Sequence, residues 1–470
     1  MKEKFKRYFF IEKFIKFVIL RNSKSKYNLG EIMVSERVTE KNRIESKFAR
    51  YVSQNILGMI GISAYILADT FFISKAEGAD GITALNLVLP IYSLIFGVGA
   101  MIGVGSATRF NILRARKDRK ADEFFSNALM FALIFGIVFI GMGIFVPGKL
   151  IAFLGGDARI VAVGTSYTRI FLLFAPFFMG NHICNAFVRN DGSPSLAMQA
   201  TLFSSLFNIV MDYVLMFPFG MGMAGAALAT AFSPVVGILM CCRHFFSKRS
   251  TIRWVWRRPS LKRLIEACQL GMSAFIGEIA SGVTTVIFNF LILGLAGNDG
   301  VAAYGIVANT AIVATSIFNG VSQGSQPLFS ECYGKGDRES VRKILEMAVG
   351  TSIVLAILVV LATNVFTEPI VRIFNSEQNG QMAVYALEGV RLYFIGFLFA
   401  GFNMVGTGYL GATEKAGWAF FTSIVRGVLA ISVCAYVLAG LLGMTGIWLA
   451  FPAAELLTAA LMIAAVRKSD

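Results

Sequence analysis

The feature that most constrains this chain is a series of apolar runs, each roughly 20 residues long, that recurs from position 51 to position 466. A run of this length lets an α-helix cross the roughly 30 Å hydrocarbon layer of a membrane. The runs are apolar on all sides, as in FFSNALMFALIFGIVFIGMGIFV at 124–146, whereas barrel strands would be shorter and would alternate. A chain that is 56% hydrophobic and only 15% charged also exceeds what a soluble core can bury. The sequence therefore predicts an all-α membrane protein.

The polar loops between these runs divide the chain into twelve predicted transmembrane helices, in two sets of six. The first set lies at 51–74, 82–108, 124–146, 161–187, 196–218 and 223–242. The second set lies at 264–293, 301–328, 344–364, 383–410, 416–438 and 444–466. The predicted domains are a basic amino-terminal segment (1–50), an amino-terminal lobe (51–242), a basic linker (243–263), a carboxy-terminal lobe (264–466) and a tail (467–470).

The basic residues behind the net charge of +15 gather in a few short loops, after the second, sixth and eighth predicted spans. Because Lys/Arg-rich loops stay in the cytoplasm, we expect 109–123, 245–262, 331–340 and both termini to be cytoplasmic. Membrane orientation also explains this charge better than nucleic-acid binding does. In the amino-terminal segment, the run at 14–20 has the character of an interfacial amphipathic helix, and Met33 opens a stretch that resembles an ordinary start.

The two halves of the chain repeat one another in the same direction. GADGITALNL at 78–87 aligns with GNDGVAAYGI at 297–306 at an offset of 219, which also places Gly105 on Gly324. Further along, Gly222 and Gly225 fall on Gly443 and Gly446 at an offset of 221. Parallel repeats of this kind favour alternating access, with the substrate held between the lobes.

Two carboxylates lie inside predicted spans, where an ionisable group costs about 2.5 to 3.5 kcal/mol and is functional by default. Asp69 lies late in the first span. Asp212 lies in the fifth span, four residues after Asn208 and therefore on the same helix face. The equivalent positions of the second half hold no acid at an offset of 220 or 221. We therefore expect these acids to do work that is specific to the first half.

Two coupling chemistries suit such acids, and the sequence leaves both open. Burial disfavours the charged form of a carboxyl group, so that it can bind and release a proton near neutral pH. Carboxylate, Asn and Thr oxygens can also hold Na⁺, which as a hard cation takes oxygen ligands as Ca²⁺ and Mg²⁺ do. The alternative for each acid is a structural, hydrogen-bonded role.

Other charged residues also fall within the predicted spans. Glu278, near the middle of the seventh, is a candidate for attracting a cationic substrate, the alternatives being a pair with a basic residue or a shallow position. Glu388 and Arg391 are three residues apart and are expected to pair with each other. Structural roles are expected for Arg426 and Glu455.

The cysteines and histidines offer no metal or catalytic pattern. The six cysteines lie singly or as the neighbours Cys241 and Cys242, and are expected to be reduced. His182 and His244 show no triad or metal-ligand spacing with neighbouring residues. We therefore expect a transporter with no cofactor or metal apart from its coupling ion, and not an enzyme.

A series of motifs narrows the class of transporter. LADTFFIS at 67–74, ALNLVLP at 84–90, NAFVRNDGSP at 185–194, NIVMD at 208–212, GMAGAALAT at 222–230 and SQPLFSECYGKGD at 325–337 follow one another through both repeats. In their order and spacing, from about residue 45 to residue 466, the chain resembles bacterial exporters of the multidrug and toxic compound extrusion (MATE) family.

This resemblance implies a V of two six-helix bundles that exports lipophilic, usually cationic drugs in exchange for H⁺ or Na⁺. The implied protein is a multi-pass monomer of the plasma (inner) membrane, with small-molecule cations and the bilayer as its partners. Its first span, 51–74, lacks the proline with which some members bend this helix, and offers only Gly58 and Gly61. The implied cation site of the amino-terminal lobe consists of Asp69, Tyr167, Asn185, Asn208, Asp212 and Thr230.

The main alternative is a flippase of the same broader superfamily, which moves lipid-linked saccharides with anionic diphosphate heads. Its cavity should be lined with Arg and Lys, and Arg169, Arg391 and Arg426 keep this alternative open. Asp69 and Asp212 instead favour a cationic cargo. An ion channel fits less well, because no pore-loop filter sequence is present and duplicated halves suit rocking.

Overall fold

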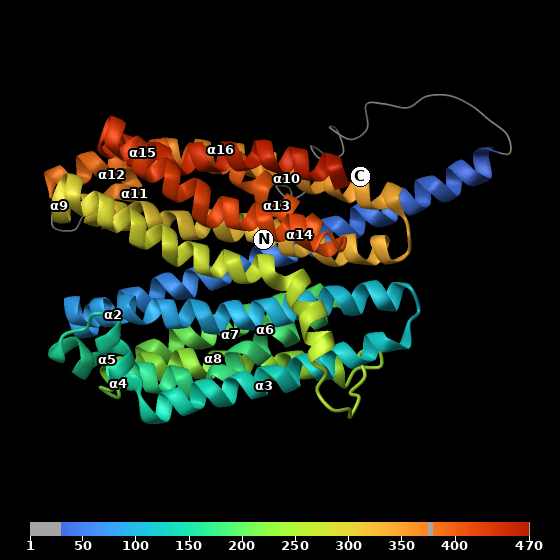
Figure 1. Cartoon of the computed structure of the whole chain (residues 1–470), viewed down its shortest axis with the longest axis horizontal. Helices are drawn as coiled ribbons and strands as arrows, with labels where there is room; N and C mark the ends of the chain where they lie inside the picture. Colours follow the sequence, from blue (N-terminus) through green and yellow to red (C-terminus); the bar gives the residue numbers. More distant parts are fainter. Residues whose placement is uncertain (1–29, 375–378, 470) are drawn as a thin grey trace, which may run out of the picture. The chain divides into compact units, whose positions relative to one another are not determined.

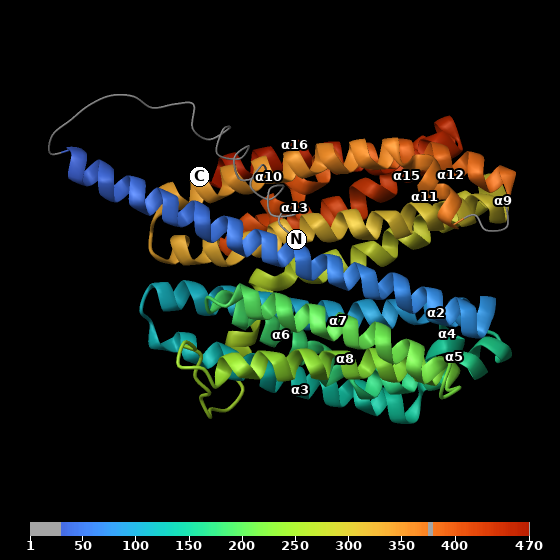
Figure 2. The ribbon, with the colours of Figure 1, turned by 180° about the vertical axis from the view of Figure 1, so that it is seen from behind.

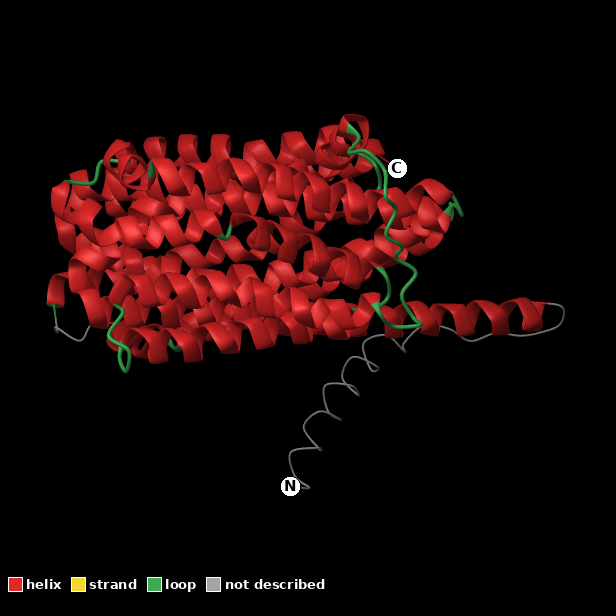
Figure 3. Ribbon diagram, turned by 90° about the horizontal axis from the view of Figure 1, so that it is seen from below, coloured by secondary structure: helices red, strands yellow, loops and turns green. Residues whose placement is uncertain are grey.

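The computed structural model describes residues 30–374 and 379–469, and every regular element in these ranges is helical (Figure 3). The amphipathic helix predicted at 14–20 lies outside the described residues. Phe48–Asp470 form one unit and the residues up to Lys47 another, so the description below concerns the larger unit.

Two long helices, each broken once by a glycine, show the repeat in the backbone. Helix α2 (Gly30–Ala115) breaks at Gly78, with φ of 61°, and helix α9 (Leu261–Gly334) breaks at Gly297, with φ of 60°. Positive φ is readily adopted only by glycine, which explains why both repeats carry one at this point. Each long helix therefore provides two membrane-crossing arms, at 43–78 and 80–115 in α2 and at 261–296 and 298–334 in α9.

Shorter helices complete each half and gather into separate groups in Figures 1 and 2. The first half adds α3 (Asp122–Phe145), α4 (Pro147–Phe153), α5 (Ala158–Leu173), α6 (Ala175–Asn190), α7 (Pro194–Met216) and α8 (Gly222–Phe245). The second half adds α10 (Arg338–Val365), α11 (Thr367–Phe374), α12 (Gly380–Tyr393), α13 (Phe397–Ala412), α14 (Ala416–Ile424), α15 (Ile431–Leu442) and α16 (Met444–Ser469). A π-helical turn, Val425–Ala430, joins α14 to α15, and short 3-10 turns lie at Arg119–Ala121 and Phe394–Gly396.

The helices account for twelve spans. Within the described residues, nine are long and apolar enough to cross a membrane, and the pair α5 and α6, bent by 49°, makes a tenth. The break at Gly297 divides α9, which counts once among the nine, into two. The twelfth is α7, whose 23 residues are long enough to cross but include the buried polar residues Asn208 and Asp212.

Close glycine contacts join the halves. A methyl group added at Gly105 on α2 would lie 2.7 Å from the carbonyl carbon of Ala267 on α9. One added at Gly324 on α9 would lie 2.8 Å from Cα of Val52 on α2. Only a residue without a side chain allows the helices to approach this closely, which explains why these two glycines occupy equivalent positions in the repeat.

Hydrogen bonds reinforce this junction at the end of the molecule that carries the basic loops. The amide nitrogen of Asn111 on α2 donates to Ser330 Oγ and to the Pro327 carbonyl on α9, both at 2.8 Å. Arg189 at the end of α6 donates to Gln323 Oε1 on α9 at 3.0 Å. The halves are therefore held together at this end.

Candidate cation and substrate site

The centre of the candidate site is the contact between α7 and α8. Asn208 and Asp212 occupy successive turns of α7 and have no exposed surface, and Thr230 of α8 is equally enclosed. In the amide orientation that satisfies both neighbours, Asn208 donates to Asp212 Oδ2 at 3.1 Å and accepts from Thr230 Oγ1 at 3.2 Å. The spacing of four residues places the amide beside the acid, as predicted, and α8 supplies the hydroxyl.

A second carboxylate comes from α2. Asp69 is 8% exposed and lies close enough to Asp212 for the two groups to interact electrostatically. In the described part of the chain, Oδ1 of Asp69 and Oδ1 of Asp212 are buried and have no hydrogen-bond partner. A buried oxygen without a donor is costly, so this pair favours a proton or a cation between or beside the carboxylates.

Tyr167 also joins this cluster, and Asn185 does not. The ring of Tyr167 on α5 is buried, interacts electrostatically with both acids and hydrogen-bonds with Thr230. The Asn185 amide instead donates to the Oδ1 and carbonyl oxygens of Asn181, one turn earlier on α6. Its other neighbour is Thr201, two turns of α7 before Asn208, or about 10 Å along the helix. The structure therefore brings together five of the six predicted residues.

Tyr65 is the neighbour that sequence reasoning missed. It lies one turn before Asp69 on α2, hydrogen-bonds with Tyr92 and interacts electrostatically with Asp69, Asp212 and Glu278. Its spacing of four residues from Asp69 was a usable signal, because such residues share a helix face. Carboxylates from three helices, two in the first half and one in the second, therefore lie within electrostatic range of one tyrosine.

Glu278 reaches this cluster from the second half. Its Cβ lies 3.6 Å from where a methyl group on Gly97 of α2 would be, so the residue faces the first half. Among the described residues, no basic side chain pairs with it. Pairing was one alternative to a substrate role, and the described residues do not support it.

An aromatic group lies beside the acids in the first half. Tyr92 stacks on Phe96 with 4.4 Å between ring centroids and on Phe171 with 4.3 Å. Phe178 and His182 pack against the same group. Aromatic faces attract cations, so this group and the acids suit the same charge of ligand.

The arginines that kept a flippase open do not converge on one cavity. Arg169 and Arg391 are exposed. The predicted pair of Glu388 with Arg391 is wrong, because Glu388 accepts a hydrogen bond of 2.5 Å from Thr445 of α16 while Arg391 points outward. Arg426 is neutralised by Glu455.

Arg426 and Glu455 form an ion pair inside the second half, in which the carboxylate is buried and the arginine side chain is 25% exposed. Arg426 lies in the π-helical turn, and its Nε donates to the two Glu455 oxygens at 2.8 and 3.1 Å. The amide of Asn403 donates to Glu455 Oε2 at 2.6 Å. Glu455 is 3% exposed, so its charge depends on these partners. In this half, a fixed arginine compensates the buried acid.

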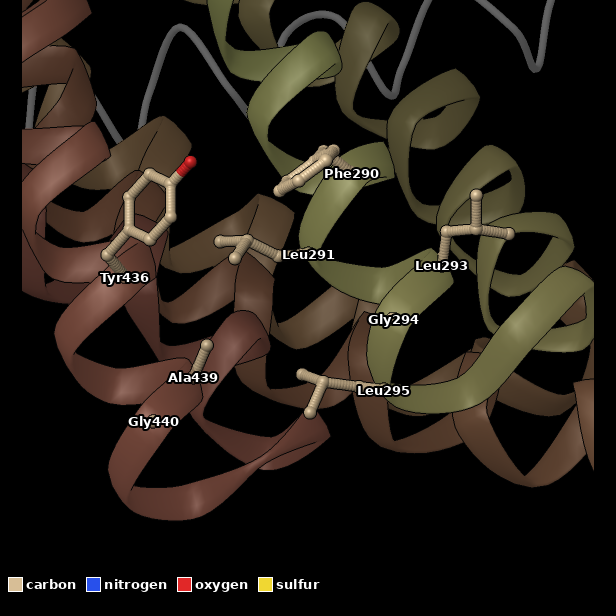
Figure 4. A pocket seen from close by; sticks show the side chains of 8 residues that line it. All are labelled: Phe290, Leu291, Leu293, Gly294, Leu295, Tyr436, Ala439 and Gly440. Atoms are coloured by element: carbon tan, nitrogen blue, oxygen red, sulfur yellow. The ribbon is translucent and has the colours of Figure 1, made fainter.

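One apolar cavity lies away from all these charges. It has a volume of about 520 Å³ and lies between α9 and α15, where Phe290 and Leu291 face Tyr436 and Ala439 (Figure 4). Its lining is apolar apart from the tyrosine hydroxyl. The chemistry of a cation site therefore rests on the α2, α5, α7 and α8 cluster and not on this cavity.

The comparison with protein families fits this arrangement. The MatE family model matches residues 55–214 and 274–437, one stretch in each half. The chain belongs to the MatE family. It is therefore a secondary transporter and not an enzyme, and the predicted fold class of two six-helix bundles is confirmed.

Individual relatives agree with this assignment. The chain is 29% identical to the multidrug export protein MepA of Staphylococcus saprophyticus over 416 residues, which cover 87% of this chain and 90% of that protein. It is 28% identical to MepA of Staphylococcus aureus MRSA252 over 435 residues, covering 90% and 94%.

Solved structures share the fold. The outward-facing conformation of a multidrug resistance MATE family transporter superposes with a TM-score of 0.85 at 21% identity, covering 90% of this chain and 96% of that one. A MOP superfamily transporter of Pyrococcus furiosus, described as having a binding pocket of reverse polarity, gives a TM-score of 0.84 at 20% identity with the same coverage. Within one fold, pocket polarity therefore has to be read from each chain's own residues.

Proposed function

We propose that this MATE-family chain exports lipophilic cations from the cell in exchange for H⁺ or Na⁺, by alternating access of its two lobes, 51–242 and 264–466. The observation that carries the proposal is that Asp69, Asp212 and Glu278 all lie within electrostatic range of Tyr65, with Glu278 facing the first half. Carboxylates from both halves attract a cation to the junction between the lobes.

Asp69 and Asp212 are the proposed coupling site. Two neighbouring buried carboxylates repel each other when both are charged, and each has an oxygen without a donor. A proton or Na⁺ relieves both costs, so the loaded and empty states of the cluster differ in free energy. The coupling ion can shift the lobe equilibrium only through such a difference.

The side chains around the acids suit either coupling ion. Na⁺ would find oxygen ligands in both carboxylates and in Asn208, Thr230 and Tyr167. A proton needs only one carboxylate to be neutralised. Asn185 is a more distant member of the proposed site and would act through Thr201.

The cargo follows from the groups next to the coupling site. Glu278 and the aromatic group of Tyr92 and Phe96 offer negative charge and π faces, which together favour a flat organic cation. The relatives named MepA are multidrug export proteins, which agrees with a lipophilic drug cargo. A flippase for anionic diphosphate heads is less favoured, because Arg169 and Arg391 are exposed.

The test uses purified protein in proteoliposomes loaded with a fluorescent lipophilic cation. A proton gradient and a sodium gradient are imposed separately, at matched membrane potential. We expect one of them to accelerate efflux above the rate in protein-free vesicles, and that gradient identifies the coupling ion. Efflux that responds to neither would contradict cation-coupled export.

The orientation makes a separate prediction. If the basic loops are cytoplasmic, an impermeant thiol reagent added to intact cells should not label single cysteines introduced at 109–123, 245–262 or 331–340 in a cysteine-free background. The same cysteines should label in inverted vesicles. The hydrogen-bonded end of the junction would then face the cytoplasm, and the described state would be outward-facing. Labelling from outside would reverse this orientation.

A further inference from the structure

A second cavity lies at the basic-loop end of the first half, and neither Asp69 nor Asp212 lines it. Its volume is about 250 Å³, somewhat below the 300 to 1,000 Å³ usual for drug-sized ligands. It is lined by the start of α7, the end of α8, the linker after it and Arg50 of α2. Its polar lining includes the side chains of Arg50, Ser193, Ser195, Arg243, His244 and Arg249.

The charge of this cavity is uncompensated. No Asp or Glu lines it, and within the described residues Arg50, Arg243 and Arg249 form no ion pair. Other arginines at the same end do have carboxylate partners, Arg114 with Asp191 and Arg257 with Glu123 among them. The basic loops thus pair part of their charge and leave three guanidinium groups facing one cavity.

The nearest acid is committed elsewhere. Asp191 accepts hydrogen bonds from His244 Nε2 at 2.7 Å and from the Thr251 amide at 2.8 Å, and pairs with Arg114. Burial raises the pKa of Asp191, but the bonds from His244 and Thr251 and the charge of Arg114 outweigh it and hold the pKa below its usual value. Asp191 therefore fixes His244 and the linker in place as the wall of the cavity and leaves the three arginines unpaired.

The remaining lining groups suit a phosphate. Guanidinium groups bind phosphate oxygens in a planar, bidentate way, and serine hydroxyls add donors. The amino end of the 23-residue helix α7 lies at the same cavity and adds the positive end of its dipole. Because the Ser193 side chain does not cap this helix, its hydroxyl is available to a ligand.

Exposed aromatic residues indicate where this phosphate comes from. In the linker after α8, the side chain of Phe246 is 90% exposed and that of Trp256 is 83% exposed. The ring of Trp254 packs edge-on against Trp256, with 5.4 Å between the ring centroids. Tryptophan interleaved with arginine is typical of segments that lie at the headgroup level of a bilayer. The cavity borders this linker through Arg249.

We propose that the cavity framed by Arg50, Arg243 and Arg249 binds the phosphate of an anionic phospholipid headgroup. The lipid would tie α7, which carries Asn208 and Asp212, to the linker between the halves. Because none of the proposed coupling or cargo residues lines this cavity, the lipid site is separate from the cargo and coupling-ion sites.

The full-length protein is tested in nanodiscs of phosphatidylcholine with and without phosphatidylglycerol. We expect phosphatidylglycerol to raise the melting temperature and to remain bound in native mass spectrometry. Substituting Arg50→Gln, Arg243→Gln and Arg249→Gln together should lower its affinity roughly tenfold or more. The matched control removes the same charge from the linker, by Lys248→Gln, Arg253→Gln and Arg258→Gln, and should retain the wild-type affinity.

Three results would overturn the proposal. Equal losses in both triple variants would mean that the lipid responds only to net charge. Stabilisation of the detergent-solubilised protein by inorganic phosphate, with none from phosphatidylglycerol, would assign the cavity to a soluble anion. If the triple variant folds poorly, the single variants Arg249→Gln and Arg243→Gln are measured instead. An unchanged affinity for phosphatidylglycerol in both would exclude the site.

Discussion

Asp212→Asn is expected to reduce gradient-driven efflux to the level of protein-free vesicles while the protein still folds and inserts. The amide keeps the size and polarity of the side chain but can neither exchange a proton nor compensate the charge of Na⁺. It also removes one of two neighbouring buried carboxylates, so thermal stability should be unchanged or raised. Asp69→Asn should behave in the same way.

The control for Asp212→Asn is Glu388→Gln, the same acid-to-amide change at a carboxylate held by Thr445 outside the cluster. This variant should transport at the wild-type rate. Wild-type efflux by an Asp212→Asn protein of normal abundance would remove Asp212 from the coupling site. The proposed lipid cavity would be unaffected by that outcome, because it contains neither acid.

The second large effect is expected on stability. Arg426→Met should destabilise the protein by about 3 to 5 kcal/mol, because it leaves Glu455 buried without its counter-charge. The loss of stability is measured as a lower melting temperature of the purified variant in detergent. Arg426→Met combined with Glu455→Gln should recover most of the loss, since no buried charge then remains unpaired.

Arg391→Met provides the matched control, because Arg391 belongs to the same half and is exposed. It should leave the melting temperature within experimental error of the wild type. If Arg426→Met melted at the same temperature as Arg391→Met, the pair of Arg426 with Glu455 would have no structural importance.

The two halves thus treat buried acids differently, although their backbones repeat. In the first half, Asp69 and Asp212 have oxygens without donors, which a proton or cation could satisfy. In the second, Arg426 and Asn403 hold Glu455, and Glu278 faces the first half. This difference explains, within the proposal, why coupling would be confined to one half.

The sequence by itself determined the membrane-helix pattern and the repeat. Long apolar runs are a local signal, and burying polar backbone in lipid leaves helices as the main solution. Gly78 and Gly297 were recognisable by their common offset, since the broken helix needs positive φ at the same place in each repeat. The proximity of Asn208 and Asp212 was also predictable, because four residues make about one helical turn.

Contacts between helices were decided only by the tertiary structure. Three of these contacts depend on how the helices rotate and pack. They are the approach of Glu278 to Tyr65, the separation of Asn185 from the acids, and the pairing of Arg426 with Glu455 across 29 residues. A span's periodicity shows which residues share a face, but not which neighbour that face meets. The prediction that Glu388 pairs with Arg391 was wrong for the same reason. Thr445 on another helix donates a hydrogen bond to Glu388, and the Arg391 side chain is exposed.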